Sequence, residues 1–233
     1  MRANALIIFI KYPQAGLVKT RLAKSIGVDN ASLLYRLFVE ALLKRTENSN
    51  YQRIICYTPV DKKNEIARWL GDEVMRIPQQ GDTLGERLSR AFAFCFAHGA
   101  RRVVAIGSDS PLLEGKILQQ AFRNLEKKDC VLGPALDGGY YLIGLSSFEQ
   151  GIFKGIDWGT EMVFEQTRDR LKGLQKTLQV LEPSFDVDTY DDILLLKKGL
   201  QDALRINSLG LKQIFDILNT ITEGNTIPGK RKG

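Results

Sequence analysis

Short apolar runs alternate with longer amphipathic segments along most of the chain. The apolar runs are typical of buried strands, and we expect strands at 5–10, 53–58, 73–78, 130–135, 140–145 and 177–182. A further strand is expected within 101–111, between a basic lead-in and a polar break. The amphipathic segments have helical spacing, at 29–45, 65–71, 83–97, 115–128, 160–172, 189–204 and 209–221. Unbroken apolar strands that alternate with helices predict an α/β fold with a mainly parallel sheet covered on both faces.

Polar residues at three helix starts support these boundaries. Asp29 is placed to cap the helix that runs to residue 45. The pairs Thr83 with Glu86 and Thr189 with Asp192 have the spacing of capping boxes, in which each side chain accepts a backbone N–H near the other.

Length and composition fit one globular domain with a small appendage. The chain has 233 residues, of which 44% are hydrophobic and 26% charged. We expect the main domain at 1–205 and a C-terminal helix with a basic flexible tail at 206–233. No apolar run reaches the roughly 18 residues of a membrane span. The first residues do not form a signal peptide, so we expect a cytoplasmic protein.

The net charge, the cysteines and the single histidine argue against several classes of function. The net charge is +6, but no arginine-rich helix and no mixture of aromatic and basic residues is present, so we expect no nucleic-acid binding. Three widely spaced cysteines indicate neither a disulfide framework nor a CxxC metal site. The single histidine, His98, is placed to end a helix, which makes histidine-dependent catalysis improbable.

In a parallel sheet ligands bind beyond the carboxyl ends of the strands, and the first candidate loop follows the first strand. It contains Lys11, Gly16, Lys19 and Arg21. Backbone N–H groups and cations of such a loop can hold phosphate oxygens. The spacing is not that of a Walker loop, because Gly16 stands three residues before Lys19 with no second glycine. A solvated basic turn and an anion-binding loop are both open from these residues alone.

A second candidate follows the strand that ends near residue 106. In the stretch Gly107-Ser108-Asp109, one carboxylate stands among small residues that leave room for a ligand. Mg²⁺ or Mn²⁺ accepts one or two carboxylates together with phosphate oxygens and water. The alternative is that Asp109 or Ser110 only caps the next helix.

Two further clusters follow later strands. Asp137, Gly138 and Gly139 lie between two expected strands, where a hairpin turn and a functional acid are compatible. Asp186 and Asp188 stand two positions apart at a strand-like end, where one acid can point to the cleft while the other caps or pairs. Together the clusters provide cations for a diphosphate and separated aspartates for a metal between its oxygens.

Six motifs in order carry a resemblance to a known family. They are FIKYPQAGLVKTRLA, QQGDTLGERL, GSDSPLL, GPALDGGYYLIGL, DWGTEMVFEQT and DVDTYDD. The chain resembles the bacterial GT-A-fold family labelled glycosyltransferase-like or rSAM/selenodomain-associated transferase. That family is related to the guanylyltransferases of molybdenum-cofactor and coenzyme F420 synthesis. The resemblance covers about residues 5 to 198 and implies a three-layer, Rossmann-like nucleotide-diphospho-sugar transferase fold.

The resemblance also implies roles for individual residues. It places Lys19 and Arg21 on the nucleotide phosphates, and Asp109 with Asp186 or Asp188 on the metal. The remaining roles are nucleotide contacts for Lys11, Gly16, Arg87, Gly107 and Ser108, and an acceptor side made by Asp137, Gly138 and Gly139. Arg87 is equally well explained as a surface helix residue.

These residues favour a metal-dependent transferase that takes a nucleotide-sugar and passes its glycosyl group to a small acceptor. Many GT-A glycosyltransferases carry a D-x-D metal motif, whereas Ser108-Asp109-Ser110 holds a single acid, which resembles nucleotidyltransferases. Nucleotidyl transfer with release of pyrophosphate is therefore the close alternative. A nucleotide-binding regulator without catalysis is the alternative of another class. The segment from about 206 onward packs either on the domain or against a second subunit, so a homodimer stays open.

Overall fold

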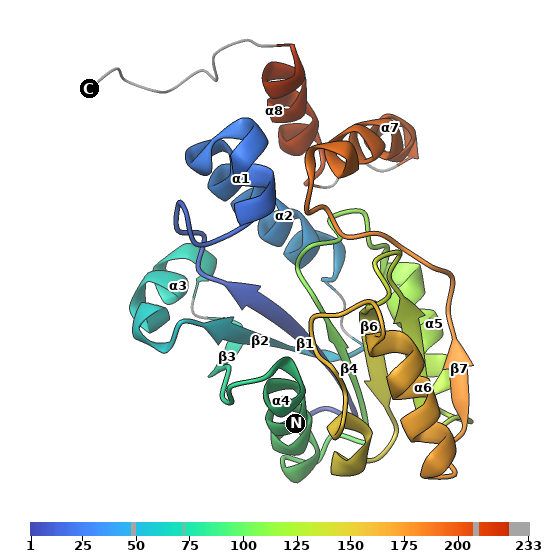
Figure 1. Ribbon diagram of the computed structural model, residues 1–233. Coiled ribbons are helices and arrows are strands. Elements are labelled where there is room, and N and C mark those ends of the chain that lie inside the picture. The colour runs from blue at the N-terminus through green and yellow to red at the C-terminus, as the bar shows by residue number, and fades with distance from the viewer. Residues whose placement is uncertain (48–49, 72, 207–209, 224–233) are drawn as a thin grey trace. The chain divides into compact units, whose positions relative to one another are not determined.

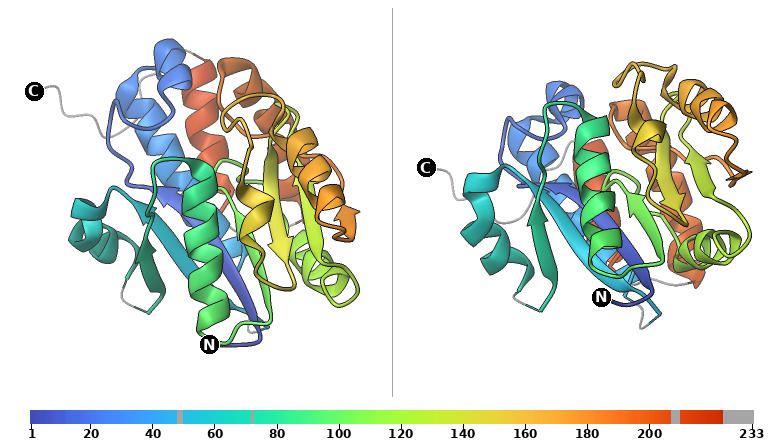
Figure 2. Two further views of the ribbon diagram at one scale, coloured as in Figure 1. Left: turned by 60° about the horizontal axis from the view of Figure 1, so that its bottom comes forward. Right: turned by 90° about the horizontal axis from the view of Figure 1, so that it is seen from below.

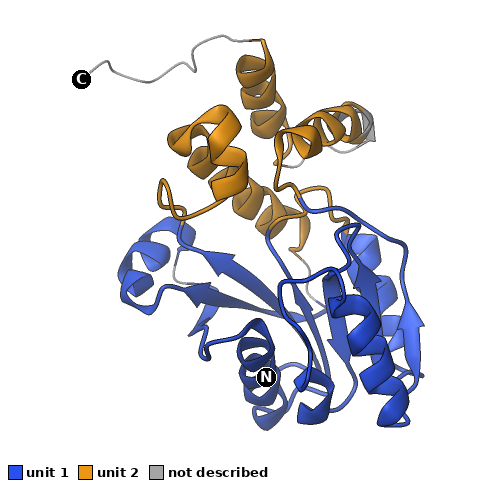
Figure 3. Cartoon of the chain, viewed as in Figure 1, with its two compact units in different colours: residues 1–12, 48–108, 115–186 blue, residues 13–47, 109–114, 187–233 orange. Residues whose placement is uncertain are grey.

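The computed structural model describes residues 1–47, 50–71, 73–206 and 210–223. The chain forms two compact units, each built from segments that are far apart in the sequence (Figure 3). Unit 1 consists of residues 1–12, 48–108 and 115–186. Unit 2 consists of residues 13–47, 109–114 and 187–233. The expected boundary near residue 205 stays a prediction, and the expected tail at 224–233 lies outside the described residues.

Unit 1 contains a seven-stranded sheet whose strand order is β3-β2-β1-β4-β6-β5-β7 (Figure 1). The strands are β1 Asn4–Lys11, β2 Gln52–Thr58, β3 Met75–Pro78, β4 Arg102–Ile106, β5 Cys130–Pro134, β6 Tyr140–Leu145 and β7 Leu178–Val180. β6 runs antiparallel to both of its neighbours, and the other pairs are parallel. The expected α/β fold with a mainly parallel sheet is confirmed.

Helices cover both faces of this sheet (Figure 2). They are α3 Lys63–Leu70 after the short 3-10 helix η1 Val60–Lys62, α4 Leu84–Ala97, α5 Gly115–Asn124, η2 Gln150–Phe153 and α6 Val163–Gly173. One core cluster joins α4, η2 and α6 to the sheet through residues such as Phe92, Phe153 and Leu171. On the other face, a side chain at Gly144 would press on Leu125, just after α5.

Unit 2 is helical. Its helices are α1 Thr20–Ile26, α2 Val28–Arg45, α7 Tyr190–Ile206 and α8 Lys212–Thr222. α2 packs on α1 and α8, and α7 packs on α1 and α8. Gly210 passes so close to Ala41 that a side chain there would collide with the α2 backbone. None of the helices in the described ranges of either unit is long and apolar enough to cross a membrane.

The helix starts agree with the sequence at two places and differ at one. Thr83 caps α4 by accepting the N–H of Glu86 at 3.2 Å, as expected, while the Glu86 carboxylate accepts the N–H of Asp82 at 3.0 Å. The expectation for Asp29 was wrong, because α2 begins at Val28 with Gly27 as its N-cap. Asp29 therefore lies in the first turn, where an acid still interacts favourably with the helix dipole.

The cysteines and the histidine behave as structural residues. Cys56, Cys95 and Cys130 are free and buried. Burial raises the pKa of the Cys56 and Cys95 thiols to about 12, which keeps both protonated and unreactive near neutral pH. His98 is the C-cap of α4, and its Nδ1 lies 2.7 Å from the carbonyl oxygen of Phe94.

Two of the six motifs meet where α4 begins. Any side chain at Gly85, in the TLGERL motif, would overlap the indole ring of Trp158 in the DWGTEM motif. Trp158 also packs edge-on against Tyr140, with ring centroids 6.3 Å apart. The close approach of α4 to this aromatic pair therefore requires glycine at position 85.

We predict that Gly85→Ala lowers the free energy of unfolding by about 1–3 kcal/mol, because the added methyl group displaces Trp158. The matched control is Gly173→Ala in α6, where an added Cβ meets nothing within 4 Å. That variant should be neutral or more stable by up to about 1 kcal/mol, because alanine favours the helix. Urea denaturation followed by tryptophan fluorescence measures both. Equal stability of the two variants would contradict the packing described.

Candidate functional site

The strands β1 and β4 are parallel neighbours from which the sheet order runs outward in opposite directions. Ligands of open α/β sheets bind outside the carboxyl ends of the strands at such a switch point. The chain leaves unit 1 just after both ends, at Tyr12 and at Ser108. The segments that follow, 13–47 and 109–114, belong to unit 2 and carry Lys19 and Asp109.

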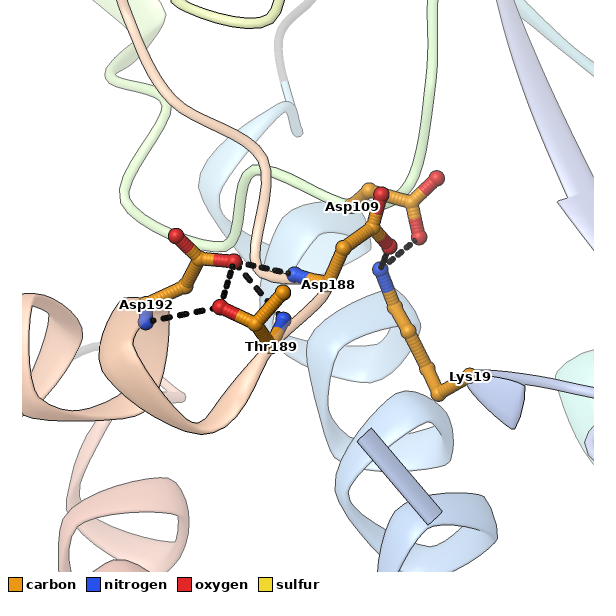
Figure 4. Close-up of polar contacts among 5 residues, drawn as sticks. All are labelled: Lys19, Asp109, Asp188, Thr189 and Asp192. Atoms are coloured by element: carbon orange, nitrogen blue, oxygen red, sulfur yellow. Dashed lines mark hydrogen bonds and ion pairs between the residues drawn. The ribbon is translucent and has the colours of Figure 1, made fainter. Parts of the chain in front are cut away.

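Within unit 2, one ammonium group is shared by two carboxylates (Figure 4). Nζ of Lys19 lies 2.5 Å from Oδ1 of Asp109 and 3.0 Å from Oδ1 of Asp188. The two oxygens therefore converge on a single point. We call Lys19, Asp109 and Asp188 the ion cluster.

The ion cluster is buried at its cation and open at its anions. The Lys19 side chain is 3% exposed, whereas those of Asp109 and Asp188 are 38% and 44% exposed. Burial acts to lower the pKa of Lys19, but the two carboxylates outweigh it and raise that pKa above its ordinary value. The ammonium thus stays charged at neutral pH. Its stabilising contribution is present below about pH 10.5 and is lost as the pH rises through the raised pKa.

The backbone at Lys19 has an unusual conformation. Its φ and ψ are 48° and 45°, in the left-handed region, and it is the N-cap residue of α1. A residue other than glycine in this region costs about 1–2 kcal/mol, so neighbouring contacts must hold it there. The two ion pairs of the Lys19 side chain supply such contacts.

Backbone and side-chain hydrogen bonds hold the segment around Asp109. The N–H of Val187 donates to the carbonyl oxygen of Asp109 at 3.1 Å, which joins the two acidic segments directly. The guanidinium of Arg45, at the end of α2, donates to the carbonyl oxygens of Leu112 and Leu113 at 3.3 Å each. The position of Asp109 is therefore fixed from both sides of its loop.

The cap of α7 holds the backbone at Asp188. Oδ2 of Asp192 accepts the N–H groups of Asp188 and Thr189 at 2.9 and 2.7 Å, and the Thr189 hydroxyl at 2.8 Å (Figure 4). The N–H of Asp192 in turn donates to the Thr189 hydroxyl at 3.4 Å. The expected capping box is confirmed, and it extends one residue further than its sequence pattern indicates.

The other predicted nucleotide-binding residues are divided between the units. Arg21 and Gly16 lie in unit 2, and both are exposed. Lys11, Arg87, Gly107 and Ser108 lie in unit 1. Arg87 donates from Nε to the carbonyl oxygen of Gly81 at 2.8 Å, which braces the loop before α4. The roles of these residues in nucleotide binding stay predictions.

The hairpin between β5 and β6, in unit 1, contains the predicted acceptor residues. Oδ1 of Asp137 accepts the N–H of Gly139 at 3.0 Å, so the acid shapes its own turn. Gly138 has a φ of 86°, and a side chain there would overlap the backbone of Glu161. Its carbonyl oxygen accepts the N–H of Phe164 at 2.9 Å. Packing of the hairpin on the segment before α6 therefore requires a glycine at 138.

The sequence left open whether Asp186 or Asp188 is the acid that acts beside Asp109. The structure brings Asp188 into the ion cluster. Asp186 is the last residue of its segment in unit 1. Sequence reasoning missed the pairing itself, because it assigned Lys19 to a phosphate and the aspartates to a metal. The available signal was the presence of opposite charges after neighbouring strands.

Unit 1 contains a cavity of about 410 Å³. The start of α4, η2 and the segment up to Trp158 form its walls, with apolar Phe153, Ile156 and Trp158 beside polar Glu86 and Lys154. Glu86 already serves as a cap, as described above. The cavity thus shows that the TLGERL and DWGTEM motifs border one space.

The donor atoms of the ion cluster suit a divalent cation. Carboxylate oxygens are the ligands that Mg²⁺ and Mn²⁺ prefer, and two of them already converge on a cation here. No group of three or more His, Cys, Asp or Glu side chains able to hold a metal occurs among the residues that the structure describes. A metal at Asp109 and Asp188 would therefore complete its coordination with water or ligand oxygens.

Comparison with known families gives one match, over residues 41–160. The family is described as "Uncharacterized protein conserved in bacteria (DUF2064)". The chain belongs to this family. Comparison with the curated proteins returned no match.

Among solved structures, one that is similar over nearly the whole chain comes from Desulfovibrio desulfuricans G20. It is described as a candidate nucleotide-diphospho-sugar transferase, is 34% identical, and has a TM-score of 0.87 over 97% of this chain and 100% of its own. This likeness confirms the expected nucleotide-diphospho-sugar transferase fold.

Two more distant structures share the fold alone. A cytidylyltransferase from Leptospira borgpetersenii serovar Hardjo-bovis is 15% identical, with a TM-score of 0.52 over 96% of this chain and 95% of its own. A CMP:2-keto-3-deoxy-manno-octonic acid synthetase, solved with CTP, is 9% identical, with a TM-score of 0.54 over 85% of this chain and 98% of its own.

We predict that Asp192→Ala lowers the free energy of unfolding by about 1–2 kcal/mol, because Asp188 and Thr189 lose the acceptor of their N–H groups. The control is Asp191→Ala, which removes the same charge from the same exposed helical turn. That change should cost only a few tenths of a kcal/mol, through the helix dipole. Chemical denaturation compares them, and an equal loss in both would show that the cap does not hold this segment.

Proposed function

We propose that this chain is a metal-dependent transferase that uses an activated nucleotide, with a nucleotide-sugar as donor and a small molecule as glycosyl acceptor. The ion cluster is the observation that carries this proposal. It joins two carboxylates and a cation from three segments of the chain, two of which follow neighbouring parallel strands. The nucleotide-diphospho-sugar transferase fold supports the same class of donor.

The proposed roles follow from charge and exposure. Asp109 and Asp188 would hold Mg²⁺ or Mn²⁺, which, when bound, would stabilise negative charge on the diphosphate oxygens. Arg21 is exposed on the first turn of α1, where its guanidinium can donate two parallel hydrogen bonds to a phosphate. Lys19 adds a second cation to the same loop. Both cations favour the transition state because negative charge builds up on the departing nucleoside diphosphate.

Asp137 is our candidate for the acceptor side. Its carboxylate is exposed and its orientation is fixed by the N–H of Gly139. In glycosyl transfer, the acceptor oxygen forms a bond to the anomeric carbon while the bond to the diphosphate breaks. Asp137 would take the proton that the acceptor hydroxyl loses.

Nucleotidyl transfer is the second candidate, and one local feature favours it. The stretch Ser108-Asp109-Ser110 carries a single acid in place of a D-x-D motif. The cytidylyltransferase and the synthetase solved with CTP share this fold. In that reaction a phosphate oxygen of the acceptor attacks the α-phosphorus of an NTP, and pyrophosphate leaves. The same cations and carboxylates would serve it.

The test is a thermal-shift panel of NTPs and nucleotide-sugars, with and without Mn²⁺, followed by product analysis. GTP and CTP belong in the panel, because the family that the sequence motifs resemble is related to guanylyltransferases. One fold relative is a cytidylyltransferase and another was solved with CTP. We expect a rise in melting temperature that grows with ligand concentration, and nucleoside diphosphate as the product. Pyrophosphate as the product would establish nucleotidyl transfer instead. Binding without any turnover would establish the regulator, and a panel without any shift would refute all three.

We predict that Asp109→Asn lowers metal-dependent turnover by a factor of about 100 or more, a loss comparable to that of a transition-state electrostatic contact. The control, Asp191→Asn, removes one exposed carboxylate of the same unit and should keep full turnover. Unchanged turnover in Asp109→Asn would refute the metal assignment.

We predict that Arg21→Met raises the KM for the donor about tenfold or more, because one charge-assisted phosphate contact is lost. Lys24→Met is the control, since Lys24 is an exposed cation one turn further along α1. It should leave KM within about twofold. Equal KM values for both variants and the parent protein would remove Arg21 from the phosphate site.

A further inference from the structure

The ammonium of Lys19 occupies the point on which the two carboxylates converge. Its Nζ lies 2.5 Å from Asp109 and 3.0 Å from Asp188, and its side chain is 3% exposed. A lysine poised for a phosphate would present its ammonium to solvent. In this structure both the buried position and the ion pairs hold it away from a free ligand.

A divalent cation and this ammonium exclude one another. Mg²⁺ binds carboxylate oxygens at about 2.0–2.1 Å, so an ion held by Oδ1 of both acids would overlap the present position of Nζ. The two positive charges would also repel each other at that distance. A metal can occupy the point between these two Oδ1 atoms only after the Lys19 side chain has moved.

The two carboxylates keep the Lys19 ammonium between them until another cation takes its place. Without a cation, the two carboxylates would repel each other at close range. The carboxylates are more than a third exposed and can be reached from solvent, whereas the ammonium is covered. A phosphate group offers the ammonium a new anion, and a metal offers the carboxylates a new cation. Binding of the phosphate to the ammonium therefore favours binding of the metal to the carboxylates, and the reverse also holds.

We propose that Lys19 is a built-in placeholder for the metal, holding Asp109 and Asp188 in position and leaving them when a divalent cation binds. This inference rests on the proposed function only in its choice of metal. It makes phosphate-ligand binding and metal binding mutually dependent, because each ligand binds the arrangement that the other produces. It also makes the protein without nucleotide a weak metal binder.

The test measures Mn²⁺ binding alone, without nucleotide, by the loss of the free-ion signal in electron paramagnetic resonance. We expect Lys19→Met to bind Mn²⁺ at least tenfold more tightly than the parent protein, because the competing ammonium is gone. Lys19→Arg keeps a cation and should stay weak. Lys24→Met removes an exposed cation of α1, outside the ion cluster, and should also stay weak. Adding Asp109→Asn to Lys19→Met should abolish the gain.

Lys19→Met can lose stability, because it leaves two carboxylates without their cation. If the variant does not fold by itself, Mn²⁺ should restore a cooperative melting transition, and failure to restore it contradicts the placeholder role. If the variant folds and its Mn²⁺ affinity equals that of the parent protein, Lys19 is a fixed structural ion pair and the inference is wrong.

These outcomes are separate from those of the transferase assays. A nucleotide that stabilises the parent protein only with Mn²⁺ supports the proposed function, whatever Lys19→Met does. A gain in Mn²⁺ affinity in Lys19→Met supports the placeholder, even if no nucleotide binds.

Discussion

The arrangement of unit 2 around its acidic residues depends on one buried positive charge. Lys19 and Asp188 are 169 positions apart in the sequence, yet one ammonium joins them and Asp109. Without it, two carboxylates would face each other with no counter-ion, an arrangement that is costly even when each is partly exposed. The hydrogen bond from Val187 to Asp109 and the cap at Asp192 bring the acidic segments together. Lys19 makes their closeness electrostatically favourable.

The need for a cation between the two carboxylates links the stability of unit 2 to its proposed function. A cluster of one cation and two anions has one negative charge in excess and partly open carboxylates, so it attracts further cations. Its left-handed backbone at Lys19 is held by the two ion pairs of that side chain, which a phosphate ligand would replace in our proposal. In the placeholder proposal, the ammonium would leave only as a metal arrives, so the two carboxylates would always have a counter-ion.

The sequence predicts the sheet well because buried parallel strands are apolar along their whole length. Every expected strand is present, and the capping boxes at Thr83 and Thr189 form as their spacing indicates. Asp29 was wrongly taken as a cap because sequence alone could not show that Gly27 begins the helix one residue earlier. Distances between charges are also hidden in a sequence. The sequence indicated that Lys19, Asp109 and Asp188 have charged side chains suited to a phosphate or a metal. It did not show that these side chains form ion pairs with one another.

A crystal structure with Mn²⁺ and a bound nucleotide or nucleotide-sugar tests the central claim most directly. The account predicts an anomalous Mn²⁺ peak in contact with Oδ1 of both Asp109 and Asp188, with Nζ of Lys19 displaced toward a phosphate oxygen. A structure with bound nucleotide in which Lys19 still joins the two carboxylates, with the metal elsewhere or absent, would contradict it.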